Sequence, residues 1–156
     1  MTGRLKREIK QSRPFSSLQE EVVLAMHRTA DQLAVPMTDV LRQQNLSLSQ
    51  YNVLRILRGA GEEGLPCGEI SERMIRRDPD LTRLLDRLET RGLVSRSRNT
   101  RDRRVVTATI TDEGRTLLDQ LDKTVDETVR KTLAHMPPER LNTLLELLEE
   151  ARGVSS

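Results

Sequence analysis

The stretch of sequence that decides the fold runs over residues 78–114 and reads DPDLTRLLDRLETRGLVSRSRNTRDRRVVTATITDEG. Its first part has the spacing of an amphipathic helix, because at 100° per residue four leucines share one face. These leucines are Leu81, Leu84, Leu85 and Leu88. Asp78 can cap the helix, Pro79 suits its first position and Gly92 suits its end. The pattern predicts a helix over Pro79–Arg91.

The second part of the stretch alternates apolar and polar residues over Val94–Ser97 and again over Arg104–Ile110. This alternation predicts a hairpin of two strands, with residues 98–103 at its tip. A shorter helix, Cys67–Ile75, is expected just before the amphipathic helix, and two helices joined by a short turn have helix-turn-helix geometry. The predicted fold class is mainly α with a small β-hairpin wing (α+β), a winged helix-turn-helix with N- and C-terminal dimerisation helices.

The chain divides into four expected parts around this stretch. Residues 1–14 have the composition of a flexible basic arm, and residues 15–46 are expected to be the N-terminal helical part of a dimerisation region. Residues 47–110 form the winged helix-turn-helix lobe. Residues 111–156 supply the C-terminal dimerisation helices.

The terminal parts carry long helical patterns. Ser17 and Glu20 form a capping-box pattern at the start of the first, and Pro36 is expected to kink or split that helix. Thr111 can cap a long helix after the lobe, and a shorter last helix follows. These helices have more apolar face than one small lobe needs to bury, so we expect part of it to pack against a second copy. The residues expected at this contact are Val129, Leu133, Leu141, Leu144 and Leu148. The alternative is that the helices only close the core of the single chain.

Composition excludes several classes of protein. The chain has 156 residues, of which 32% are charged and 1% aromatic, so a single domain with an aliphatic core is expected. No apolar run approaches the roughly 18 residues of a membrane span. The charged N-terminus lacks the apolar region of a secretory signal, and one cysteine cannot form an internal disulfide. We therefore expect a cytoplasmic protein with no membrane partner.

Positive charge is concentrated where the wing is predicted. The net charge is only +2, but residues 68–104 carry eleven Lys or Arg against seven Asp or Glu. Residues 105–156, by contrast, carry six against ten. Five arginines lie within nine residues of the ribbon, and their mutual repulsion is relieved by a polyanion. The helix and the ribbon together therefore predict binding to double-stranded DNA.

The expected DNA contacts divide between the helix and the segments beside it. Thr82 and Arg83 point outward one turn into the helix, and an arginine can form two hydrogen bonds with a guanine in the major groove. Arg87 can reach a base or a phosphate, whereas Asp86 is expected to pair with a neighbouring side chain. The arginines expected mainly at phosphates are Arg76, Arg77, Arg96, Arg98, Arg101 and Arg103.

The ordered set of motifs resembles the MarR family of bacterial transcriptional regulators. The matching elements are Leu81–Glu89, Gly92-Leu93-Val94, the D-x-R element Asp102-Arg103-Arg104 and Ile110–Gly114, within a resemblance over residues 17–152. It implies that Arg104 enters the minor groove while Asp102 orients the ribbon. It also implies a two-fold dimer on an inverted-repeat operator, a repressor role, and, as in many members, release by a small anionic or phenolic ligand.

Candidates for a ligand site are few, because aromatic residues are nearly absent. His27, Tyr51 and Arg55 are the residues expected to bind such a ligand. Cys67 lies in the first turn of a predicted helix, where the dipole can activate a thiol, although it is also the size of a packing residue. No cofactor and no metal site are expected, because His27, His135 and one cysteine do not form a cluster.

Two other classes of function fit the sequence less well. An enzyme is not expected, because there is no Gly-rich phosphate loop and no nucleophile–base pair. A winged helix that binds another protein is the alternative, although that role does not need five arginines on the ribbon. Salt-sensitive binding to plain duplex DNA distinguishes the alternative from the favoured interpretation.

Overall fold

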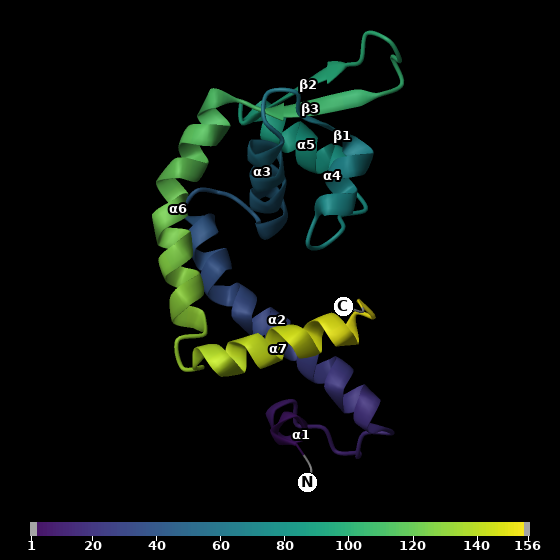
Figure 1. Ribbon diagram of the computed structural model, residues 1–156, viewed down its shortest axis with the longest axis vertical. Helices are drawn as coiled ribbons and strands as arrows, with labels where there is room; N and C mark the ends of the chain where they lie inside the picture. Colours follow the sequence, from purple (N-terminus) through teal and green to yellow (C-terminus); the bar gives the residue numbers. More distant parts are fainter. Residues whose placement is uncertain (1–2, 155–156) are drawn as a thin grey trace.

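The computed structural model describes residues 3–154 and places a small lobe at one end of long helices (Figure 1). The elements are α1 (Arg4–Glu8), α2 (Leu18–Arg42), α3 (Leu48–Ala60), β1 (Leu65–Pro66), α4 (Cys67–Arg73), α5 (Leu81–Thr90), β2 (Val94–Arg98), β3 (Val106–Ile110), α6 (Asp112–Thr132) and α7 (Pro138–Ala151). We call residues 47–110 the lobe, and α2, α6 and α7 together the stalk. The fold is mainly α with a small antiparallel sheet, as predicted.

The core is aliphatic and joins the lobe to the adjoining parts of α2 and α6. Leu41 of α2 and Leu118 of α6 are fully buried in the same cluster as the leucines of the lobe. Tyr51 is the aromatic member of this cluster. Burying one leucine contributes roughly 1.5–3 kcal/mol, so the shared cluster holds lobe and stalk in contact.

The wing is part of a three-stranded antiparallel sheet in the order β1-β3-β2. Strand β2 runs from Val94, opposite Ile110, to Arg98, opposite Val106. The first strand is thus one residue longer than predicted, and the second begins at Val106 instead of Arg104. The cause is the tip, residues 99–105, whose side chains and backbone bond to one another and leave the ladder.

Strand β1 was missed by the prediction, because two residues are too short to show alternation. It pairs Leu65 with Ala108 and so adds a third strand beside β3. Gly64, at φ +67°, lies against the carbonyl oxygen of Ala108, where a side chain would clash. A glycine is therefore required for the close approach of these two backbones.

Helix α2 is continuous for 25 residues, so Pro36 does not split it. A proline inside a helix costs about 3 kcal/mol through the lost hydrogen bond. Met37 and Val40 pack against the core directly after Pro36 and hold the helix together. Ser17 caps the start by accepting a hydrogen bond from the Glu20 N–H at 3.1 Å, but the predicted capping box is only half formed, because the Glu20 carboxylate accepts from Ser16 instead of from the Ser17 N–H. Within residues 3–154, no helix has the length and apolar character needed to cross a membrane.

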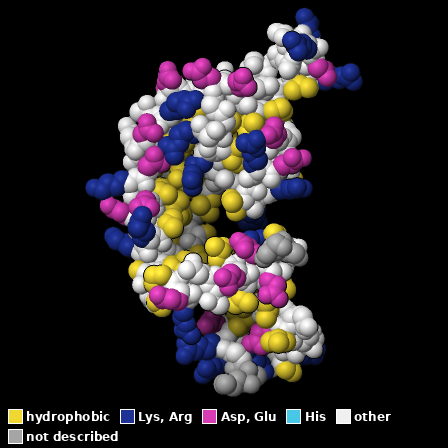
Figure 2. All heavy atoms as spheres, in the orientation of Figure 1, with side chains coloured by type: hydrophobic (Ala, Val, Ile, Leu, Met, Phe, Trp, Pro, Cys, Tyr) yellow, Lys and Arg dark blue, Asp and Glu magenta, His cyan; other side chains and the backbone are white. Residues whose placement is uncertain are grey.

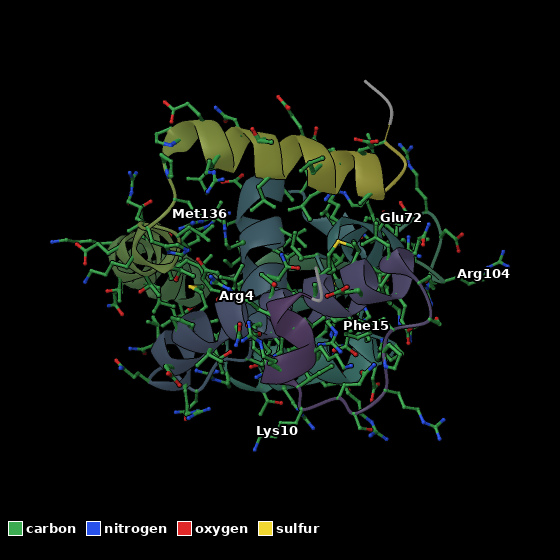
Figure 3. The ribbon with its side chains drawn as sticks, turned by 90° about the horizontal axis from the view of Figure 1, so that it is seen from below. Arg4, Lys10, Phe15, Glu72, Arg104 and Met136 are labelled. Atoms are coloured by element: carbon green, nitrogen blue, oxygen red, sulfur yellow. The ribbon has the colours of Figure 1, made fainter. Side chains whose placement is uncertain are left out.

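The N-terminal segment contains a helix where a loose arm was predicted. Residues 4–8 form α1, and its Leu5 is only 8% exposed. One apolar side chain among charged ones gives no helical pattern, which is why the sequence did not reveal it. Lys10, at φ +52°, lies just after α1 and its side chain points away from the molecule (Figure 3). The ends of the predicted arm and C-terminal part, residues 1–2 and 155–156, lie outside the described residues.

The stalk leaves apolar side chains uncovered. Helix α7 buries no residue, and its Leu145 and Leu147 are 54% and 57% exposed. Val35 of α2 and Val129 of α6 are likewise about half exposed. Hydrophobic side chains are open to solvent around these helices (Figure 2). A single chain therefore carries an apolar surface that it does not cover itself.

Candidate nucleic-acid interface

The outward face of α5 is polar. The four predicted leucines are 9% exposed or less, which confirms the amphipathic pattern. Thr82, Arg83 and Arg87 are exposed on the opposite side of the helix. The side chain of Arg83 is 77% exposed, and its Nε lies 3.4 Å from an oxygen of Asp80. An ion pair this exposed is worth about 1 kcal/mol or less, so Arg83 can exchange Asp80 for another partner.

The start of α5 differs from the prediction. The helix begins at Leu81, its N-cap is Asp80, and no side chain caps it. Asp78 instead accepts a hydrogen bond from the N–H of Asp80 at 2.8 Å. The carboxylate of Asp78 therefore closes the turn before the helix, and Pro79 lies in that turn instead of in the first helical position.

The segment between α4 and α5 presents two more arginines. Arg76 and Arg77 are exposed, as their predicted contact with phosphates requires. The preceding residue, Ile75, is 92% exposed, and its N–H donates to the Asn52 side-chain oxygen at 2.9 Å. Asn52 belongs to α3, so this hydrogen bond anchors the turn to the body of the lobe.

The wing tip is closed by side-chain hydrogen bonds. The side-chain oxygen of Asn99 accepts from the N–H of Arg101 at 2.8 Å, and Asp102 accepts from the N–H of Arg104 at 3.0 Å. Such bonds from Asn and Asp to nearby backbone are a common way to build tight turns. Asn99 was missed by the sequence analysis, and its place in the polar loop was the only signal that could have found it.

The charged side chains of the tip project into solvent. Arg98, Arg101, Asp102, Arg103 and Arg104 are all exposed. The Arg104 side chain is 95% exposed, and its Nε lies 3.5 Å from Asp102. It extends from the edge of the molecule in Figure 3, and basic side chains gather at the end of the wing in Figure 2. The predicted group of wing residues is therefore together and accessible, with Asp102 positioned to orient Arg104.

Arg96 differs from the other arginines of the ribbon, because it is engaged within the lobe. Its guanidinium pairs with Asp86 and, at 3.1 Å, with Glu89, and its side chain is only 20% exposed. Its backbone N–H also donates to Glu89 at 3.0 Å. These hydrogen bonds from Arg96 hold the pKa of Glu89 below its ordinary value. The expected phosphate contact is thus corrected to a link between β2 and α5, and the expected pairing of Asp86 is confirmed.

The candidate ligand residues are only partly brought together. The guanidinium carbon of Arg55 lies 5.9 Å from the centre of the Tyr51 ring, which is a cation–π distance. Burial raises the pKa of Tyr51, whose side chain belongs to the core. His27 is exposed on α2, and no hydrogen bond or ion pair joins it to these two within residues 3–154. An open depression on α6 is lined by other residues, Asp112, Glu113, Thr116, Leu117 and Gln120.

Cys67, the free cysteine, is half-buried at the start of α4 and packs against the core. The side chain therefore has the packing role that was weighed against a reactive one. Among the described residues, no three His, Cys, Asp or Glu side chains are grouped so that they could hold a metal ion.

A short helix, a turn, an exposed polar helix and a basic antiparallel hairpin define a winged helix-turn-helix protein. A family model described as MarR family matches residues 46–106. The chain belongs to the MarR family, whose members are transcriptional regulators and not enzymes.

Two curated relatives are repressors. The chain is 33% identical over 97 residues to the transcriptional repressor MdtR of Bacillus subtilis, an alignment that covers 62% of this chain and 61% of that protein. It is 30% identical over 111 residues to the homoprotocatechuate degradative operon repressor of Escherichia coli, which covers 71% of this chain and 74% of the relative.

Solved structures agree with this family. A MarR transcription factor from Planctomyces limnophilus is 39% identical, with a TM-score of 0.67 over 87% of this chain and 98% of that one. A mutant of MarR from E. coli, complexed with operator DNA, is 24% identical, with a TM-score of 0.76 over 87% of this chain and 99% of that one. At that identity the second structure shows the likeness of the fold alone.

Proposed function

We propose that this protein is a repressor that binds double-stranded DNA in a sequence-specific manner, as a homodimer on an inverted-repeat operator. The observation that carries the proposal is the exposed polar face of α5 beside a wing whose tip is formed by solvent-exposed arginines. Within residues 3–154 their guanidinium groups are exposed and have no buried role, whereas duplex DNA offers each of them a phosphate or a base edge. Such a role places the protein in the cytoplasm.

The proposed contacts follow from exposure. Thr82, Arg83 and Arg87 face the major groove, where an arginine can bind guanine through two hydrogen bonds. Arg104 enters the minor groove, whose negative potential favours a guanidinium. The proposed phosphate contacts are Arg76, Arg77, Arg98, Arg101 and Arg103. Arg96 does not contact DNA in this proposal. Its two ion pairs hold the wing in a fixed position relative to α5.

The dimer is supported by the uncovered stalk. The half-exposed leucines of α7 and Val129 of α6 lie on the terminal helices that were predicted to meet a second copy. Burying such side chains in a contact removes apolar surface from water, at about 25 cal/mol per Å². A two-fold contact between stalks presents two copies of α5, so the operator is an inverted repeat with half-sites about one helical turn apart.

The repressor role and the ligand are the least direct parts of the proposal. The names of the two curated relatives support repression. For the ligand, Arg55 beside Tyr51 offers a positive charge next to an aromatic ring, which suits a small anionic or phenolic molecule. His27 completes this proposed site only if the ligand spans from α3 to the exposed face of α2.

A selection experiment tests the function. The protein is mixed with a random library of DNA duplexes, and the bound duplexes are recovered and sequenced through several rounds. Enrichment of one inverted repeat, followed by protection of both half-sites in a footprint, is the expected result. Recovery of duplexes without any shared sequence contradicts specific binding and favours the alternative, a winged helix that binds another protein.

A further inference from the structure

Two arginines fasten the lobe to the stalk, and neither lies among the residues proposed to touch DNA. Arg58 lies in the last turn of α3, and Arg91 is the residue directly after α5. Arg58 reaches from the lobe to α6, and Arg91 reaches to the turn directly after α2. We call Arg58 and Arg91 the clamp arginines.

Arg58 binds α6 through a two-point ion pair. Its Nη1 and Nη2 donate to the two carboxylate oxygens of Asp122 at 2.8 and 2.9 Å, and Nη1 also reaches Asp119 at 3.2 Å. The Arg58 side chain is 27% exposed, and its hydrogen bonds lower the pKa of Asp122. Two parallel hydrogen bonds fix the relative orientation of both groups, which a single contact does not.

Arg91 binds the turn that directly follows α2. Its Nη1 donates to the carbonyl oxygen of Asn45 at 2.8 Å, and its Nη2 donates to that of Gln44 at 2.9 Å. These carbonyls follow the last turn of α2, where the helix dipole favours a positive charge. Because Arg91 comes directly after α5, this clamp ties α5 to the turn after α2, and the N–H groups of that turn are themselves bonded to Leu41 and Arg42 of α2.

The two clamp arginines supply directional contacts, which the core between lobe and stalk lacks. The core there is made of aliphatic side chains, such as Leu41 and Leu118, whose attraction depends on buried area and not on direction. Aliphatic contacts keep the lobe attached, whereas the hydrogen-bonded clamps select one angle of attachment. The two clamp arginines lie at separate points of the lobe, at α3 and at the end of α5. Together they therefore resist rotation of the lobe about either contact.

We propose that Arg58 and Arg91 are positioning residues that set the spacing between half-sites that the dimer accepts. This inference rests on the proposed function. In a two-fold dimer, the angle between lobe and stalk determines the separation of the two copies of α5. One added base pair moves a half-site by about 3.4 Å and rotates it by roughly 35°. A rigid junction between lobe and stalk prevents the dimer from binding the altered spacing. A flexible junction allows the lobes to move and bind it.

The first test compares binding across operators of different spacing. The probes are the inverted repeat selected by the wild-type protein and the same repeat with one base pair added or removed at its centre. The clamp variants are Asp122→Asn and Arg91→Met. The matched control is Asp126→Asn, one turn further along α6, whose partner Arg130 lies on the same helix at 2.8 Å.

The wild type and the control are expected to lose about tenfold or more in affinity when the spacing changes, because the DNA must be deformed to fit. The clamp variants are expected to bind all spacings within about threefold of one another. A steep spacing profile in both clamp variants overturns the proposal. So does an equal loss at every spacing together with a lower melting temperature, which is the mark of a purely structural role.

A second measurement keeps the inference separate from DNA binding. Spin labels at Thr82→Cys, in a Cys67→Ser background, report the distance between the two copies of α5 in the DNA-free dimer. The clamp variants are expected to broaden this distance distribution, and the control is not. If the wild type selects no operator but the distributions broaden, the proposed function and its half-site spacing fail, while the role of both arginines in fixing the angle between lobe and stalk stands. Unchanged distributions in both clamp variants overturn the positioning role.

Discussion

At the scale of single residues, the arginines of the wing occupy two chemically different environments. Arg96 is mostly covered and donates to two carboxylates of α5, so its charge is already neutralised. Arg104 is almost fully exposed and pairs with Asp102 beside it. A charge that is balanced within the lobe stabilises the lobe, whereas an exposed one is available to a partner.

Replacing Arg104 by alanine is expected to weaken operator binding by about 1–3 kcal/mol, the range for a good groove contact. Fluorescence anisotropy with the selected duplex measures this loss. Lys123→Ala, at an 87% exposed side chain on α6, removes one positive charge away from the wing and serves as the control. Equal affinities for the wild type and Arg104→Ala would remove Arg104 from the interface.

Replacing Glu89 by glutamine is expected to destabilise the fold at neutral pH and progressively less in acid. The pKa of Glu89 is lowered in the folded protein, so folding favours its ionised form. Its contribution is therefore present above the ordinary glutamate pKa, about 4.3, and is lost as the pH falls through the lower folded value. Urea midpoints of both proteins, from neutral pH to about pH 3, measure the difference.

The control for this pH dependence is Glu62→Gln, an exposed glutamate in the loop before β1. This substitution is expected to change the urea midpoint only slightly, and by the same amount at every pH. A difference in urea midpoint between the wild type and Glu89→Gln that stays constant with pH would show that the charge of Glu89 does not stabilise the fold through its ion pair with Arg96.

At the scale of elements, the close approach of α6 to the strand before it depends on a glycine. A Cβ on Gly114 would meet the carbonyl oxygen of Leu93 and lie 2.7 Å from Ile110 Cγ1. Alanine favours a helix over glycine by about 1 kcal/mol, but forcing atoms into a packed site costs typically 1–3 kcal/mol. The clash involves backbone, which cannot rotate away, so the packing term decides the sign.

We therefore expect Gly114→Ala to destabilise the protein by about 1–2 kcal/mol net. Gly68→Ala on α4 is the matched control, because a Cβ there meets nothing within 4 Å. That change is expected to be neutral or to stabilise by up to about 1 kcal/mol. Chemical denaturation measures both, and a Gly114→Ala variant as stable as Gly68→Ala contradicts the predicted packing.

Elements with many regularly spaced residues were predictable, and those that depend on tertiary contacts were not. The leucine stripe of α5 and the alternation of the wing follow from local spacing, so both appear as expected. Strand β1 exists only because Ala108 lies beside Leu65, and the burial of Leu5 in a five-residue helix has no local pattern that could reveal it. The start of α5 moved because Asp78 had a competing backbone partner in the turn.

The candidate site shows the same division. The sequence predicted the basic wing and the polar face of α5. It also predicted that Asp86 pairs with a neighbouring side chain. The sequence could not show that Arg96, among five similar arginines, lies opposite Asp86 and Glu89. The pairing of Arg96 depends on how β2 packs against α5. In the same way, the role of Asn99 depends on how the wing tip closes. The DNA contacts themselves stay predictions.

At the scale of the whole molecule, the stalk leaves an apolar surface that a second copy is proposed to cover. Leu144→Asp on α7 is expected to raise the dissociation constant of the dimer at least about thirtyfold, as for a central interface residue. Helix α7 buries no residue within the chain, so the fold of each lobe is expected to survive. Analytical ultracentrifugation measures the oligomeric state.

Asn142→Asp places the same charge two residues away, at an exposed position on the face of α7 that carries Glu146, and controls for the added aspartate. It is expected to leave the dimer intact. A Leu144→Asp protein that is still a dimer at low concentration and still binds the operator would rule out this interface.

The central claim, that the protein binds duplex DNA specifically through its basic wing and α5, is tested most directly by a salt titration. Anisotropy is measured on the DNA just upstream of the gene that encodes this chain and on a shuffled duplex of equal composition. We expect tighter binding to the upstream DNA, with a steep negative slope of affinity against salt from released counterions. No binding to either duplex at low salt would contradict the claim.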